Sequence, residues 1–202
     1  MGDLPSRKTV RLKDIDYNEA GAYFVTICTK YRQYLFGRIQ DGQMNLNQFG
    51  EIAEQEIGIT NQLRASSGVQ IIRSVVMPNH VHLLIELTDC QLNDVTFVGT
   101  QRAVSAEQLR RFRILLKQSI PVIVRAYKAA VTKRIRDIYR EAEVSGGHST
   151  LCPYKGKSND PTDMTIWQSR YYEHVVRGRF DYREIADYIE NNPARWETDK
   201  LK

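Results

Sequence analysis

The sequence predicts an α+β fold in which helices pack on an antiparallel sheet. Segments rich in β-branched and aromatic residues, at 22–29, 69–87 and 166–176, are typical of strands. Other segments repeat their apolar residues with a helical period. The expected order is strand, helix, strand, strand, helix, strand and a terminal helix, which is the βαββαβ order of a ferredoxin-like sheet. This fold hosts many functions, so the function must be argued from individual residues.

The first half of the chain is expected to supply three of the four strands. Residues 22–29 (AYFVTICT) form the first strand, and residues 34–46 form a hairpin with Asp-Gly at its turn. Asn47 is expected to cap a helix that ends near the Ser-Ser-Gly of residues 66–68. Two apolar runs within 69–87 flank a Pro-Asn dipeptide, which predicts an antiparallel strand pair with a tight connection.

The second half of the chain is expected to supply three helices. A helical pattern begins at Ser105, and Pro121 suits the first turn of a second helix that continues through Ile138. After the strand at 166–176, Asp181 and the Glu three residues later form a pattern that we interpret as a capping box. It predicts a last helix over residues 182–191, which would carry Tyr188.

Length and composition predict a single domain over residues 1–202, with variable polar loops at 88–104 and 143–165. No apolar run approaches the ~20 residues that cross a bilayer, and the first residues are polar, so neither a membrane partner nor a secretory leader is expected. Three cysteines, far apart and in no CxxC pair, favour a reducing cytoplasm.

The net charge of +5 is unevenly distributed along the chain. Residues 102–140 hold eleven Lys and Arg against two acidic residues, a net charge of +9, so the rest of the chain carries −4. Such a basic block indicates a polyanionic partner, most often nucleic acid. A solvated helix face would give the same pattern, and charge alone does not distinguish the two interpretations.

His80 and His82 lie two apart on a predicted strand, so both imidazoles point to one face of the sheet. Two adjacent nitrogen donors form half of a divalent-metal site. Glu86 shares this face, and we expect it to fix the tautomer of an imidazole. The alternative is a pair of structural histidines, which a bare His-x-His pattern does not exclude.

Tyr188 and Asn192 lie four apart at the end of the last predicted helix, hence on one face. The Asn192 amide oxygen is a candidate third metal ligand, and the Tyr188 phenol is a candidate nucleophile. On chemistry alone three other tyrosines are rival nucleophiles: Tyr23, Tyr127 and Tyr139. The alternative for the pair is a tyrosine at the edge of the core and an asparagine that ends a helix.

These groups together suit metal-assisted attack on a phosphodiester. A cation would withdraw charge from the scissile phosphate while the Tyr188 oxygen attacks in line. The resulting phosphotyrosine ester conserves the bond energy, so rejoining would need no ATP. Two imidazoles and an amide oxygen in an open site favour Mg²⁺ or Mn²⁺ over structural zinc.

Several segments resemble the REP-associated tyrosine transposases, single-tyrosine HUH proteins related to the transposases of IS200-like elements. They are LKDIDYNEAGAYFVTICT, VVMPNHVHLLIEL, AYKAAVTKRI, WQSRYYEHVVR and YREIADYIENNPARW, and they extend over most of the chain. The combination of PNHVH with YIENNP is specific, whereas each motif alone is not.

The resemblance implies a ferredoxin-like fold in which His80 and His82 bind the metal and Tyr188 forms a 5′-phosphotyrosine link. It places the third ligand at Asn192. It further implies single-stranded DNA with REP-like palindromic hairpins as the partner, a monomer or homodimer, and a cytoplasmic, nucleoid-associated location.

Seven further residues are predicted to contact DNA. Cations on the second long helix are candidates for phosphate contacts, and aromatic residues that alternate with arginines near residue 170 are candidates for base stacking. They are Arg125, Lys128, Arg136, Trp167, Arg170, Tyr172 and Arg177. His174 shares a face with Tyr172, and we expect it to have a structural role.

Two alternatives stay open at this point. The first is a non-catalytic DNA-hairpin-binding protein or repressor on the same fold, which would bind DNA without cleaving it. The second is a ferredoxin-like RNA-binding module that stacks bases on strand aromatics and is indifferent to chelators.

Overall fold

A computed structural model of the protein describes residues 20–88, 119–199 apart from 145–164, and 201–202. Its four-stranded sheet has the order β4-β5-β1-β6, and every neighbouring pair is antiparallel. The strands are β1 (Gly21–Cys28), β4 (Val69–Met77), β5 (His80–Leu87) and β6 (Tyr172–Val175). With one helix before β4 and another before β6, this is the predicted ferredoxin-like βαββαβ arrangement, in which β1 and β5 occupy the centre.

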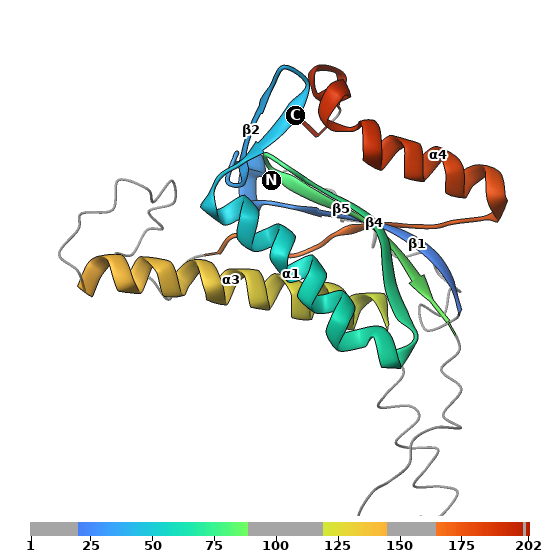
Figure 1. Cartoon of the computed structure of the whole chain (residues 1–202), viewed down its shortest axis with the longest axis horizontal. Helices are drawn as coiled ribbons and strands as arrows, with labels where there is room; N and C mark the ends of the chain where they lie inside the picture. Colours follow the sequence, from blue (N-terminus) through green and yellow to red (C-terminus); the bar gives the residue numbers. More distant parts are fainter. Residues whose placement is uncertain (1–19, 89–118, 145–164, 200) are drawn as a thin grey trace, which may run out of the picture.

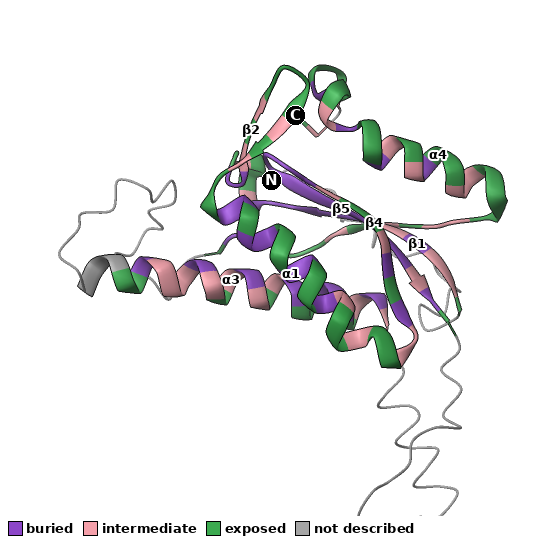
Figure 2. Ribbon diagram, in the orientation of Figure 1, coloured by how far each residue is buried: buried purple, intermediate pink, exposed green. Residues whose placement is uncertain are grey.

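Helices cover both faces of the sheet (Figure 1). α1 (Gln48–Arg64) and α3 (Ile120–Val144) lie on one face, and α4 (Gly178–Asn191) lies on the other. The larger hydrophobic cluster joins the sheet to α1 and α3, and a smaller one joins Leu84 of β5 to Ile185 and Ile189 of α4. Buried residues accordingly line both faces of β5, while the outer side of α4 is exposed (Figure 2). Among the described residues no helix is long and apolar enough to span a bilayer.

The hairpin and the cap that precede the sheet's second strand form as predicted. β2 (Gly37–Gln40) pairs with β3 (Gln43–Leu46), and Gly37 has a φ of 140°. A side chain at Gly37 would meet the Asn45 carbonyl, so only glycine fits there. The side chain of Asn47 accepts hydrogen bonds from the first backbone N–H groups of α1.

Two boundaries in the last third of the chain differ from the prediction. β6 begins at Tyr172, because the segment before it turns inward to bury Trp167 and forms only an isolated bridge to Thr29. α4 begins at Gly178, so Asp181 lies inside its first turn and accepts a hydrogen bond from the N–H of Arg177. The predicted capping box, with Asp181 preceding the helix, is therefore wrong. The helix expected from Ser105 and nearly all of both variable loops lie outside the described residues.

Candidate active site

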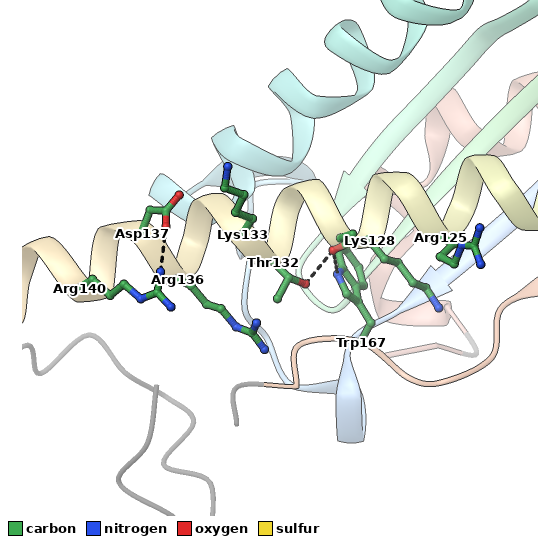
Figure 3. A pocket seen from close by; sticks show the side chains of 9 residues that line it. Arg125, Lys128, Thr132, Lys133, Arg136, Asp137, Arg140 and Trp167 are labelled. Carbon is green, nitrogen blue, oxygen red and sulfur yellow. Dashed lines mark hydrogen bonds and ion pairs between the residues drawn. The ribbon is translucent and has the colours of Figure 1, made fainter. Parts of the chain in front are cut away.

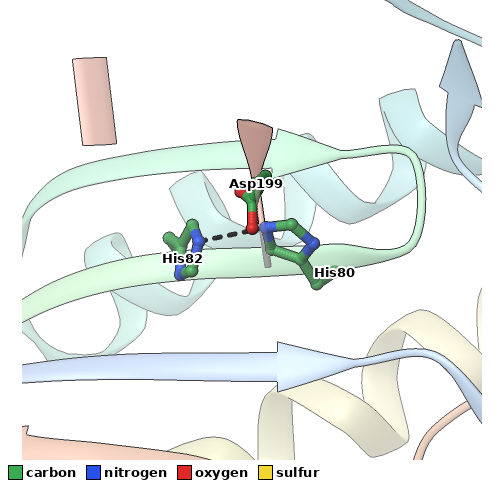
Figure 4. Close-up of side chains that lie close together, drawn as sticks. All are labelled: His80, His82 and Asp199. Atoms are coloured by element: carbon green, nitrogen blue, oxygen red, sulfur yellow. Dashed lines mark hydrogen bonds between the residues drawn. The ribbon is translucent and has the colours of Figure 1, made fainter. Parts of the chain in front are cut away.

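Two buried imidazoles face each other at the start of β5, on the α4 side of the sheet. His80 and His82 are 0% and 1% exposed, and their Nε2 atoms are 3.0 Å apart (Figure 4). Period-2 alternation sends Val81 into the cluster under α1 and α3, while the His82 ring stacks on Phe24 on the opposite face. The predicted pair therefore shares one face and converges on one point.

The other nitrogen of each imidazole has a hydrogen-bond partner. His80 Nδ1 lies 2.7 Å from the Asn79 side-chain oxygen, and Asn79 Nδ2 donates to the Leu201 carbonyl at 2.8 Å. The Asn79 oxygen must therefore accept the His80 Nδ1 proton, which leaves a lone pair on Nε2. His82 Nδ1 lies 2.8 Å from the Thr26 hydroxyl, directly across β1 and β5.

The expected partner, Glu86, does not lie at these nitrogens. It pairs in register with Ala22, four residues beyond His82 along β5, whereas His82 pairs with Thr26. Four strand residues span about 13 Å, so Glu86 is too distant to orient the imidazole. The prediction for Glu86 is wrong, and Thr26 is the hydrogen-bond partner of His82 Nδ1.

Burial sets the protonation of the pair. Desolvation lowers the pKa of His80 to about 4 and holds the pKa of His82 well below its usual value, with the neighbouring His80 lowering it further. Both rings are neutral at pH 7. A neutral imidazole is the form that binds a metal ion.

Tyr188 projects from α4 onto this pair. Its hydroxyl lies 3.5 Å from His82 Nε2 and 3.5 Å from an oxygen of Asp199. Its ring contacts the His82 ring and meets Phe24 edge-on. Burial, with the nearby negative charge of Asp199, raises the pKa of the Tyr188 phenol, so the hydroxyl is protonated at neutral pH.

Asn192 follows α4 and is 1% exposed. Its Nδ2 donates to Asp199 Oδ2 at 3.1 Å. Within the described part of the chain its Oδ1 has no hydrogen-bond partner. A buried amide oxygen without a partner is costly, and a bound cation would satisfy it.

Asp199 is the member of the site that sequence reasoning missed. It follows the 3-10 helix η5 (Pro193–Thr198), and its carboxylate and the two histidines offer ligand atoms within 4.8 Å of one another. Asp199 lies in a polar C-terminal segment, with no motif or apolar period to mark it. Only the return of η5 toward β5 brings it to the site.

The donor set fits the divalent cation that the resemblance implies. It offers two neutral imidazoles with converging Nε2 atoms, an amide oxygen to which no described residue donates, and a carboxylate. Two nitrogens 3.0 Å apart match the span of about 3 Å between adjacent ligands at ~2.1 Å from one octahedral ion.

The rival tyrosines are core residues. Tyr23, Tyr127 and Tyr139 are all buried in the cluster beneath α1 and α3, on the other face of the sheet. The Tyr127 hydroxyl donates to the Ala53 carbonyl, and burial raises the pKa of that phenol far above its usual value. Tyr188 is therefore the tyrosine that meets the histidine pair among the four considered.

No protein-family model matches the chain. An uncharacterized protein of Haemophilus influenzae is 34% identical over 195 residues, which cover 96% of this chain and 92% of that protein. The chain belongs to the same family as this protein.

Two solved structures are similar to this chain. One is described as a REP-associated tyrosine transposase bound to a REP hairpin; it has 17% identity and a TM-score of 0.42, over 99% of this chain and 77% of that chain. The other is a provisionally assigned transposase of Deinococcus radiodurans, with 19% identity and a TM-score of 0.39, over 90% of this chain and 97% of that chain.

A second feature of this family member is a basic groove along α3, on the face of the sheet away from Tyr188. Figure 3 shows side chains that line this groove, whose volume is about 450 Å³. Five cations line it against one acidic residue. The lining side chains include Arg125, Lys128, Lys133, Arg136, Asp137, Arg140 and Trp167. Three of the predicted phosphate contacts, Arg125, Lys128 and Arg136, therefore share one surface.

Trp167 forms a wall of this basic groove and is only 6% exposed. Its ring packs against Phe36 and Tyr127, and its N–H donates to the Lys128 carbonyl. A base cannot stack on this ring without displacing core residues, so the predicted base contact of Trp167 is not supported by its position.

The remaining predicted contacts lie along the β6 edge. Tyr172 is 48% exposed and pairs in register with Thr26, so it stands on the same face of the sheet as His82. Arg170 and Arg177 are exposed before and after β6. His174 also lies on this face, but its Nε2 is 2.9 Å from Asp181, which agrees with the expected structural role.

Proposed function

We propose that the protein is a metal-dependent, transposase-like nuclease that cleaves and rejoins single-stranded DNA near palindromic hairpins. The nucleophile is Tyr188, and the intermediate is an ester between its phenolic oxygen and a 5′-phosphate. The observation that carries this proposal is the 3.5 Å distance between the Tyr188 hydroxyl and His82 Nε2, within a cluster of candidate metal ligands. The motif resemblance indicates Tyr188 and the two histidines independently, and adds Asn192.

The residues of the chain have distinct tasks in this reaction. His80, His82 and Asn192 would hold a Mg²⁺ or Mn²⁺ ion, which when bound supplies charge withdrawal from the scissile phosphate. Tyr188 is held by Phe24 and the His82 ring, so its oxygen is positioned before the substrate binds.

Each cleavage exchanges one phosphate ester for another. The Tyr188 oxygen forms a bond to phosphorus, the bond from phosphorus to the 3′ oxygen breaks, and that oxygen leaves with a proton. Because the phenol is protonated at neutral pH, its proton must leave as the new bond forms, and the carboxylate of Asp199, with Oδ2 3.5 Å from the hydroxyl, can accept it. Attack by a 3′-hydroxyl on the phosphotyrosine reverses the step and rejoins the strand.

Two surfaces suit the DNA. The basic groove on α3 offers sequence-independent phosphate contacts through Arg125, Lys128 and Arg136. Tyr172, exposed on the face that carries His82, offers a stacking platform for an unpaired base close to the site. Arg170 and Arg177 flank this tyrosine along the chain and add positive charge at the same edge.

Covalent capture of DNA tests the proposal. The protein is incubated with Mn²⁺ and 3′-labelled single-stranded oligonucleotides that combine palindromic hairpins with randomised flanks. A denaturing gel and the intact mass of the protein then reveal any adduct. Wild type should form an adduct that carries the 3′ fragment, and Tyr188→Phe should form none.

The matched control is Tyr182→Phe, because Tyr182 lies on the same helix but lines a pocket with Ala22, at the end of β1 opposite to the histidines. That variant should retain the adduct. An adduct in Tyr188→Phe would remove Tyr188 from the mechanism. Binding of hairpin DNA by wild type without any adduct across the pool would favour a non-catalytic hairpin-binding protein.

A further inference from the structure

Asp199 is held at the histidine pair by a network that reaches both sides of the site. Its Oδ2 accepts from Asn192 Nδ2 at 3.1 Å and from the Tyr188 hydroxyl at 3.5 Å. Its Oδ1 accepts from the Leu201 N–H at 2.7 Å. The carboxylate is therefore fixed by three separate donors rather than exposed in a free tail.

The same C-terminal segment is anchored to the residue that orients His80. Asn79 accepts the His80 Nδ1 proton and donates to the Leu201 carbonyl. Trp196 of η5 is buried against the His80 ring, with ring centroids 6.1 Å apart. These contacts couple the position of Asp199 to that of the first histidine, as expected for ligands of one ion.

A divalent cation at this site needs a carboxylate among its ligands, because the other candidate ligands have no charge. Imidazole binds a metal ion in its neutral form, and the Asn192 amide has no charge, so without Asp199 the three protein ligands would carry no negative charge. Hard cations such as Mg²⁺ are usually bound through one or two carboxylates. Ligating carboxylates are themselves hydrogen-bonded by outer residues, which is the arrangement seen around Asp199.

We propose that Asp199 is a ligand of the same metal centre as His80 and His82, and that it supplies the negative charge of the site. This inference rests on the proposed function, which assigns the histidine pair to a divalent cation. It adds a carboxylate from the C-terminal segment to the ligands that the sequence motifs indicate.

The test measures Mn²⁺ affinity of the full chain, by calorimetry or by electron paramagnetic resonance, without DNA. Asp199→Asn keeps the shape and an acceptor oxygen but loses the charge. It should weaken Mn²⁺ binding by about tenfold or more, since even the loss of an outer partner typically costs 10–100-fold. The control is Glu197→Gln, two residues away on an exposed side chain, which should bind Mn²⁺ as wild type does.

Ionic strength separates ligation from a through-space effect of charge. A loss of affinity in Asp199→Asn that persists in 0.5 M KCl, where the Debye length is only about 4 Å, supports ligation. A loss that disappears at that salt concentration, or an affinity within twofold of wild type, overturns the proposal.

Two more variants complete the test. One is used if Asp199→Asn does not fold, and the other tests the proposed function itself. If Asp199→Asn does not fold, Asp199→Cys should give a Cd²⁺–thiolate absorption band above that of wild type, and the absence of this band overturns the proposal. His80→Ala should abolish Mn²⁺ binding. If His80→Ala binds normally, the metal centre and the proposed function fail together. If it loses binding but Asp199→Asn does not, only the assignment of Asp199 fails.

Discussion

The phenolic oxygen of Tyr188 lies 3.5 Å from Nε2 of His82, although 106 positions separate the two residues. Phe24 contacts both rings, stacking on His82 with centroids 5.0 Å apart and meeting Tyr188 edge-on at 6.0 Å. The sheet thus presents the imidazole, α4 presents the phenol, and one aromatic residue of β1 sets their separation.

A divalent cation should stabilise the protein through this site. A ligand that binds only the folded state adds about 2.7 kcal/mol to the free energy of unfolding at a concentration of 100 times its Kd. We therefore expect Mn²⁺ to raise the Tm of wild type, EDTA to reverse the shift, and His82→Ala to show none. Differential scanning calorimetry with and without Mn²⁺ measures this, and an equal shift in the variant would place the bound ion elsewhere.

The hydroxyl of Thr26 should matter for metal binding, because it is the hydrogen-bond partner of His82 Nδ1. Thr26→Val keeps the shape of the side chain but removes that partner, and we expect a 10–100-fold loss of Mn²⁺ affinity. Thr26→Ser keeps the hydroxyl and should bind nearly as wild type does. Calorimetric titration compares the three proteins, and equal losses in both variants would indicate a packing effect instead.

Tyr127→Phe should separate stability from catalysis. The buried Tyr127 hydroxyl donates to the Ala53 carbonyl and joins α3 to α1, so its loss should lower the free energy of unfolding by about 1 kcal/mol. Urea denaturation measures the change. The DNA adduct of this variant should match that of wild type, whereas Tyr188→Phe should lose the adduct and keep most of its stability. A missing adduct in Tyr127→Phe would contradict the choice of nucleophile.

The secondary structure was largely predictable because it depends on local signals. The β-branched runs of β1, β4 and β5, the Asn47 cap and the helical period of α3 each lie within a short segment. The boundaries of β6 and α4 were not predictable from the sequence. The start of β6 depends on the burial of Trp167, which is a matter of tertiary packing, and the start of α4 depends on the positive φ of Gly178.

The members of the site were predictable only where a regular spacing marks them. His80 with His82 follows strand alternation, and Tyr188 with Asn192 follows the helix repeat. The choice of Thr26 over Glu86 depends on the register between β1 and β5, which strand patterns do not specify. Asp199 reaches the site because η5 returns toward β5, and no pattern in the polar C-terminal segment predicts that return.

Lys128 should make nucleic-acid binding depend on pH. Its Nζ donates to the Gln168 and Arg170 carbonyls, and burial lowers its pKa to about 8. The ammonium group is therefore mostly charged at pH 7 and mostly neutral at pH 9. Loss of one phosphate contact reduces the slope of log K against log salt concentration by about 1. We expect that reduction for wild type on hairpin DNA between pH 7 and pH 9.

Lys128→Arg isolates this effect, because an arginine at position 128 stays charged at both pH values. Its salt slope, measured by fluorescence anisotropy, should be the same at pH 7 and pH 9.

The free energy of unfolding of wild type should rise with pH, whereas its affinity for DNA should fall. The folded state releases the Lys128 proton near pH 8 and the unfolded chain near pH 10.5, so this group contributes increasing stability as pH rises between those values. A salt slope of wild type that does not change with pH would exclude Lys128 from the phosphate contacts.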